Sequence, residues 1–94
     1  MKELLFLNLI HNLGQNLTVR RGIKWSVEKA ADVQGIGPRP IRTLTRKFSD
    51  LKDSDLKYEH DDSCRTVGGL VTAMLNAYPE FDTSDIVTLV YYYN

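Results

Sequence analysis

The sequence is poor in cysteine and has no long apolar run, and each shortage excludes a class of protein. Its 94 residues contain one cysteine, so an internal disulfide and a cysteine-based metal cluster are both excluded. The apolar run at residues 4–10 is too short and too interrupted to span a bilayer. Because Glu3 follows Lys2 directly and no small-residue cleavage site follows, it does not resemble a signal peptide either. We therefore expect a protein of a reducing compartment, the cytoplasm, without membrane association.

Glycine and proline are also few, and they form no phosphate-binding loop. Residues 35–40 read Gly-Ile-Gly-Pro-Arg-Pro, a spacing that matches neither the dinucleotide-binding pattern nor the P-loop. The prolines also remove amide donors that a phosphate would need. We therefore predict an ordinary loop at this position, and we expect no cofactor and no metal site.

The net charge is zero, but the charges are unevenly distributed along the chain. Residues 20–47 hold eight basic and two acidic residues, a net charge of +6. Residues 48–94 hold three basic and nine acidic residues, a net charge of −6. A basic segment of this kind is compatible with a phosphate-facing surface. The alternative is that the two halves neutralise each other in the folded chain, and both interpretations stay open.

The first half of the chain is predicted to be mainly strands. Residues 17–20 are rich in β-branched side chains, and the alternation over residues 23–27 predicts a half-buried strand. Residues 41–48 predict another strand. The apolar spacing of residues 4–13 is helical, although a short strand that leads into such a helix fits equally well.

The second half is predicted to contain helices and then a strand. Residues 54–59 predict a short helix. Residues 67–78 carry apolar side chains at i, i+3, i+4, i+7, i+8 and i+11, which predicts an amphipathic helix capped by Thr66 and ended by Pro79. The β-branched and aromatic run at residues 86–93 predicts a central strand that is covered on both faces.

The order of these elements predicts an α+β fold in a single domain, residues 1–94. Two or three strands in the first half must pair with a strong strand at the end of the sequence. A small sheet that curls into a partial barrel, with two to three helices at one side, satisfies these pairings.

Several short motifs, taken in order, resemble the ASCH domain family. Residues 14–20 look like its glycine followed by Thr-x-Arg, and residues 31–33, Ala-Asp-Val, follow where the family usually has Gly-Asp-Val. Residues 48–60 resemble its strand and acidic helical turn, and residues 74–92 resemble its last helix and strand. The resemblance spans residues 4–93. It implies a PUA-like partial β-barrel whose ligands are RNA or modified nucleosides.

Within that family the motifs are similar to the small bacterial N4-acetylcytidine amidohydrolases, which use a lysine, a threonine and a glutamate. By position, Thr18 looks like the threonine and Glu59 looks like the glutamate. The position that matches the lysine holds Gln15 or Asn16, and neither side chain accepts a proton. Lys24 is the candidate replacement, because burial can lower the pKa of a lysine enough for it to act as a base.

Two further departures concern the barrel itself. Ala31 stands where the family has a glycine, and residues 35–40 are shorter than the strand-rich stretch usual in that enzyme. The resemblance therefore implies a barrel that lacks a strand or is more open.

The candidate ligand-binding residues are Arg20, Arg21 and Trp25. Arginine forks match phosphate oxygens, and the alternative for both arginines is a solvated strand edge. Trp25 offers a ring face on which a base can stack. Its place on the same face as Ile23 and Val27 favours the alternative, a core side chain.

Three functions remain open at this point. The first is an RNA- or modified-nucleoside-binding domain of the ASCH type, with a pocket lined by Thr18, Arg20, Lys24 and Glu59. The second is an amidohydrolase that deacylates N4-acetylcytidine-type nucleosides, with Thr18 as nucleophile, Lys24 as base and Glu59 as proton carrier. The third is a protein-interaction module with no nucleic-acid ligand. None of them defines the oligomeric state.

Overall fold

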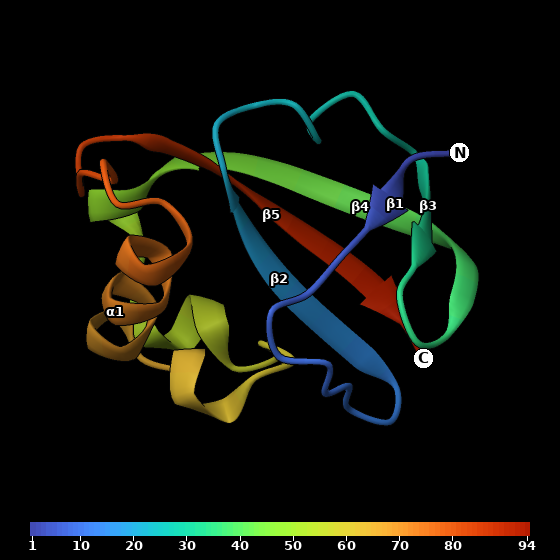
Figure 1. Cartoon of the computed structure of the whole chain (residues 1–94). Helices are drawn as coiled ribbons and strands as arrows, with labels where there is room; N and C mark the ends of the chain where they lie inside the picture. The colour runs from blue at the N-terminus through green and yellow to red at the C-terminus, as the bar shows by residue number, and fades with distance from the viewer.

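The fold is a mixed five-stranded sheet with one α-helix and three short 3-10 helices (Figure 1). The computed structural model describes residues 1–94. The strands are β1 (Glu3–Leu4), β2 (Gln15–Arg21), β3 (Ala30–Val33), β4 (Gly37–Lys47) and β5 (Ile86–Tyr93). The helices are η1 (Phe48–Asp50), η2 (Asp53–Leu56), η3 (Asp62–Cys64) and α1 (Val67–Ala77). No helix has the length and apolar character that a membrane span requires.

The centre of the sheet is β5, which lies between β4 and β2 and is antiparallel to both. Residues 15–21 of β2 pair with residues 87–93 of β5, so Leu17 lies opposite Tyr91. The predicted pairing of the last strand with the front of the chain is therefore confirmed. The long β4 continues past β5 and bends to pair with β3, which curls the sheet into a half-barrel (Figure 1). The α+β class is confirmed as well.

Two apolar cores lie on opposite faces of this sheet. The first is formed by β2, β5, α1 and the 3-10 segments, with Leu17, Leu56 and Met74 buried in it. The second is formed on the other face by β1, β3 and β5, with Leu4, Val33 and other side chains. Alternating residues of β5 enter the two cores in turn, as the pleat of a strand requires. The prediction that the last strand is covered on both faces is confirmed.

The predicted strand at residues 23–27 is wrong. Gly22 ends β2 with a φ of +82°, a left-handed conformation that turns the chain away from the sheet. Two turn hydrogen bonds take the place of strand pairing here. The N–H of Ser26 donates to the carbonyl of Ile23, and the N–H of Glu28 donates to the carbonyl of Trp25. Because the alternation of apolar residues does not continue into a sheet, Ile23 is 61% exposed while Trp25 is buried.

The N-terminal segment is neither helix nor uniform core. Only Leu4 is fully buried, in the two-residue strand β1, and the following residues form an irregular chain segment. Leu7 is 86% exposed and Leu13 is 95% exposed. Hydrogen bonds to distant side chains hold this segment in place, and the N–H of Phe6, for example, donates to Gln34 Oε1 at 2.9 Å. These long-range bonds outweigh the local helical spacing.

The segment at residues 35–40 belongs partly to a strand, because β4 begins at Gly37. The N–H of Ile41 donates to the carbonyl of Lys29, which shows that odd-numbered residues of β4 bond to β3. Pro38 and Pro40 therefore occupy positions whose missing N–H would point away from β3. This geometry explains how two prolines lie within a paired strand.

The helix predicted at residues 67–78 is confirmed as α1. The hydroxyl of Thr66 accepts a hydrogen bond from the N–H of Gly69 at 3.1 Å, as expected of an N-cap. Glycine is required at 69, because a Cβ there would collide with the carbonyl oxygen of Ser63. The helix predicted at residues 54–59 is present in reduced form as η2.

The burial pattern predicts how two leucines differ in their contribution to stability. Leu17→Ala removes a side chain with no exposed surface and should lower the free energy of unfolding by about 2–5 kcal/mol. The matched control Leu13→Ala, at a side chain that is 95% exposed, should change it by less than about 0.5 kcal/mol. Urea unfolding of both variants measures the difference, and equal losses would contradict this fold.

Candidate functional site

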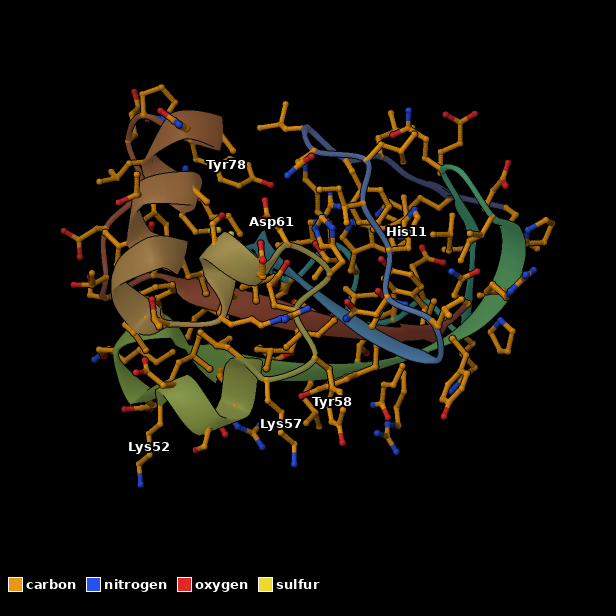
Figure 2. The ribbon with its side chains drawn as sticks, turned by 90° about the horizontal axis from the view of Figure 1, so that it is seen from below. His11, Lys52, Lys57, Tyr58, Asp61 and Tyr78 are labelled. Atoms are coloured by element: carbon orange, nitrogen blue, oxygen red, sulfur yellow. The ribbon has the colours of Figure 1, made fainter.

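A cavity of about 440 Å³ lies at the outer edge of β2. Its walls come from the N-terminal segment, the loop after η2, and α1. The lining residues that carry polar groups are Asn8, Thr18, Arg20, Glu59, His60, Asp61, Asn76 and Tyr78. Figure 2 shows Asp61 and Tyr78 near each other, Tyr78 at the C-terminal end of α1. Two of the three elements that form the walls are irregular, so the cavity depends on the way they are attached to β2.

The attachment is a short parallel bridge between Leu17 and Glu59. The N–H of Leu17 donates to the carbonyl of Tyr58 at 2.8 Å, and the N–H of His60 donates to the carbonyl of Leu17 at 2.9 Å. These two bonds extend the sheet by one residue pair beyond β2. They place Glu59 and His60 at the end of the cavity, with Glu59 only 2% exposed.

Beyond this bridge the edge of β2 is open toward the cavity. Gly14 and Gly22 bond to β5 through their backbone, so even-numbered residues of β2 face β5 and odd-numbered ones face outward. Leu17 uses its outward groups in the bridge. The same alternation directs the N–H and C=O of Val19, a cavity-lining residue, away from β5. The cavity therefore offers one backbone donor and one backbone acceptor, side by side.

Glu59 and His60 share a proton in the wall of the cavity. His60 Nδ1 lies 2.8 Å from the carbonyl oxygen of Ile10, which only accepts, so Nδ1 carries a proton. His60 Nε2 lies 3.2 Å from Glu59 Oε1. Burial raises the pKa of Glu59 to about 8, and burial lowers the pKa of His60. At neutral pH the pair is therefore a carboxylic acid that donates from Oε1 to a neutral imidazole, rather than an ion pair.

The second carboxyl oxygen of Glu59, Oε2, is buried and has no hydrogen-bond partner within the protein. Because the proton lies on Oε1, Oε2 is an acceptor. A buried acceptor without a partner costs about 1–3 kcal/mol relative to a satisfied one. A ligand in the cavity that donates a hydrogen bond to Oε2 recovers this free energy.

Arg20 supplies a positive charge to the same cavity. Its Nη2 donates to the carbonyl of Leu5 at 2.6 Å, its Nε donates to Thr18 Oγ1 at 3.3 Å, and its guanidinium lies 5.0 Å from the centre of the Phe6 ring. Burial is the main cause that lowers the pKa of Arg20. No carboxylate lies within ion-pair distance of it, and Glu59 is neutral. The guanidinium therefore favours an anionic or electron-rich group of a ligand.

The structure brings together three of the residues predicted from the sequence and places three elsewhere. Thr18, Arg20 and Glu59 line the cavity, and Lys24 does not. Lys24 is exposed in the turn after β2, where its carbonyl accepts a hydrogen bond from Lys2 Nζ at 3.1 Å. The pocket predicted with Lys24 in its wall is thus corrected to one without any lysine.

The other two predicted ligand-binding residues also lie outside the cavity. Arg21 donates to Asp85 Oδ2 at 3.0 Å, across the pairing of β2 with β5. Trp25 is 8% exposed and packs in the second core, with Lys2 Nζ 4.7 Å from the centre of its ring. The core alternative for Trp25 is the one the structure supports.

Two contributors to the cavity had no sequence signal: His60 and the backbone of Val19. His60 stands among acidic residues and has no apolar pattern around it. Its position follows from the bridge to Leu17, which joins segments that lie far apart in the sequence. Only its place directly after the candidate Glu59 could have singled it out.

Comparisons of the chain with protein-family models, with curated proteins and with solved structures find no match.

The raised pKa of Glu59 predicts a pH dependence of stability. Folded chains hold the proton of Glu59 up to about pH 8, whereas the unfolded chain loses it near the ordinary value of 4.5. Between these values the folded state binds more protons, so the contribution of Glu59 to stability falls as pH rises, by up to about 1.4 kcal/mol per pH unit. Glu59→Gln keeps a donor toward His60 but does not titrate.

The measurement is urea unfolding of the wild-type chain and Glu59→Gln between about pH 5 and pH 8. As pH rises, the free energy of unfolding of Glu59→Gln should increase relative to that of the wild type. A difference between the two that stays constant with pH would show that Glu59 is ionised in the folded chain.

Proposed function

We propose that this chain is an ASCH-type, PUA-like domain that binds an RNA base or a modified nucleoside in the cavity at the edge of β2. The order of its motifs along the sequence supports the family assignment. The observation that carries the ligand assignment is the buried, unpartnered Oε2 of Glu59. Glu59 lines the cavity, and no protein group within hydrogen-bond distance donates to this oxygen.

The groups around Oε2 favour a planar heterocycle. The backbone donor and acceptor of Val19 lie at a strand edge, where they meet in-plane partners as a neighbouring strand would. A nucleobase presents donors and acceptors along one edge of a flat ring. Most of the remaining lining is apolar, including Phe6, Leu70 and Met74, and suits the two faces of such a ring. The volume of about 440 Å³ lies within the range of small-molecule sites, about 300–1,000 Å³.

The polar groups of the cavity support binding more directly than hydrolysis. The hydroxyl of Thr18 accepts a hydrogen bond from Arg20 and makes no contact with Glu59 or His60 within hydrogen-bond distance. A hydroxyl nucleophile needs a group that takes its proton. The cavity has no lysine for this purpose, because Lys24 lies outside it. We therefore place nucleoside binding first, and deacylation of N4-acetylcytidine is measured in the same experiment.

The test compares two substitutions at Glu59. Glu59→Met removes the acceptor and keeps most of the volume, whereas Glu59→Gln keeps an acceptor oxygen and donates to His60 through its amide. Glu59→Met should weaken binding of the preferred nucleoside by about tenfold or more, and Glu59→Gln should bind within a few-fold of the wild type. Glu28→Met, in the turn before β3, is the matched control and should bind as the wild type does.

Calorimetry with the four RNA nucleosides and N4-acetylcytidine measures these affinities, and chromatography of the same mixtures detects any cytidine released. Release of cytidine that Thr18→Val abolishes would replace the binding function with the amidohydrolase. No binding of any of the five by the folded wild-type chain would reject the nucleoside site and leave the protein-interaction module.

A further inference from the structure

The backbone of Glu59 is held from behind the cavity by two side chains that do not line it. Arg65 Nε donates to the carbonyl oxygen of Glu59 at 3.1 Å. Arg65 Nη2 donates to the side-chain oxygen of Asn12, Oδ1, at 2.9 Å. Neither Arg65 nor Asn12 is among the cavity-lining residues. Because a guanidinium holds its donors in one rigid plane, these two bonds fix the Glu59 backbone relative to Asn12.

Asn12 is itself anchored to β2. The side chain of Asn16, which has no exposed surface, bonds both backbone groups of Asn12. Asn16 Oδ1 accepts from the N–H of Asn12 at 2.7 Å, and Asn16 Nδ2 donates to the carbonyl of Asn12 at 3.1 Å. Asn12 Nδ2 donates to the carbonyl of Tyr58 at 3.2 Å. That carbonyl also accepts from the N–H of Leu17, so these bonds meet the bridge that attaches Glu59 to β2.

The same bonds connect the three elements that form the walls of the cavity. Asn12 ends the N-terminal segment, and Glu59 lies in the loop after η2. Arg65 directly precedes Thr66, the N-cap of α1. The two bonds of Arg65 therefore give the three walls a common anchor on the side away from the ligand space.

Arg65 also brings a positive charge close to Glu59. It has no carboxylate within ion-pair distance. Burial is the largest effect on the pKa of Glu59 and raises it, as does the charge of Asp61. The charges of Arg20 and Arg65 lower it. Arg20 acts from the cavity wall, whereas Arg65 acts from its place beside the Glu59 carbonyl.

We propose that Arg65 and Asn12 are positioning residues of the cavity, which hold Glu59 so that its free oxygen Oε2 is presented to a ligand. They act through the backbone of Glu59 and do not touch the ligand. Their effect on ligand affinity rests on the proposed nucleoside function, whereas their effect on Glu59 itself does not.

The first test is the titration of the Glu59 carboxyl carbon, followed by NMR in the folded chain without ligand. Arg65→Gln removes a positive charge and should move the midpoint to higher pH. Asn12→Ala removes no charge, but it frees the Arg65 fork and should move the midpoint in the same direction. The double variant should shift it no further than Arg65→Gln does, because both changes act through one arginine.

Arg39→Gln is the matched control for these variants. Arg39 also donates to a backbone carbonyl, that of Tyr93 at 3.2 Å, and it lies outside the cavity. Its loss should leave the Glu59 midpoint where the wild type has it. Arg65→Lys keeps the charge without the planar fork and should also keep that midpoint.

The second test is calorimetry with the nucleoside that the wild type binds most tightly among the four RNA nucleosides and N4-acetylcytidine. Arg65→Gln and Arg65→Lys should each weaken binding by about fivefold or more, because both lose the fork that fixes Glu59. Arg39→Gln should bind as the wild type does. A merely structural arginine would lower stability in urea and leave the affinity of the folded chain unchanged.

Unchanged midpoints in folded Arg65→Gln and Asn12→Ala would overturn the proposal even if nucleosides bind, and so would wild-type affinity in Arg65→Gln. The Arg65 variants keep the test in place should Asn12→Ala fail to fold. If the wild type binds none of the five nucleosides, the proposed function fails, and the midpoints alone decide whether Arg65 and Asn12 position Glu59.

Discussion

The antiparallel pairing of β2 with β5 is the constraint on which the rest of the molecule depends. It joins a strand near the start of the sequence to the last strand, so neither the sheet nor its two cores can form without closing the whole chain. The same pairing turns the odd-numbered backbone groups of β2 outward. Leu17 uses these groups to fix Glu59 and His60, and Val19 leaves them directed to the cavity. Sheet formation and site formation are thus two results of one register.

Charge in the cavity is arranged around a neutral Glu59 and a charged Arg20. Burial raises the pKa of Glu59 by more than the backbone of Asp61 and the charges of Arg20 and Arg65 lower it, and the neighbouring histidine already donates its Nδ1 proton to Ile10. Sharing one proton between Oε1 and His60 Nε2 avoids a buried charge and leaves Oε2 as an acceptor. Arg20 keeps its charge beside two oxygen acceptors and a Phe6 ring. A ligand with a donor for Oε2 and an electron-rich group for Arg20 matches this arrangement.

Much of the fold was predictable from the sequence where local pattern and long-range structure agree. The stripe of α1 and the apolar run of β5 identify those elements, because most of the residues that define each pattern pack in or against the cores. The pattern failed at residues 23–27, where Gly22 redirects the chain, and at residues 4–13, where distant side chains hold an extended segment. Pro38 and Pro40 led to the prediction of a loop. Only the register of β4 against β3 shows that these two positions need no N–H for strand pairing.

The candidate site was less predictable than the fold. Thr18, Arg20 and Glu59 came from resemblance and share a cavity, whereas Lys24 was chosen for its chemistry alone and points elsewhere. No periodicity marks His60 or the open edge at Val19, because both depend on a bridge between residues 17 and 59.

Glu59 is a buried carboxylic acid with one free oxygen, and NMR tests this protonation state most directly. The chemical shift of the Glu59 side-chain carboxyl carbon, followed as a function of pH in the folded chain, gives the pKa of that group. The structure predicts a midpoint at about 8. A midpoint near the ordinary value of 4.5 would mean an ionised, solvated carboxylate and would contradict this account of the cavity.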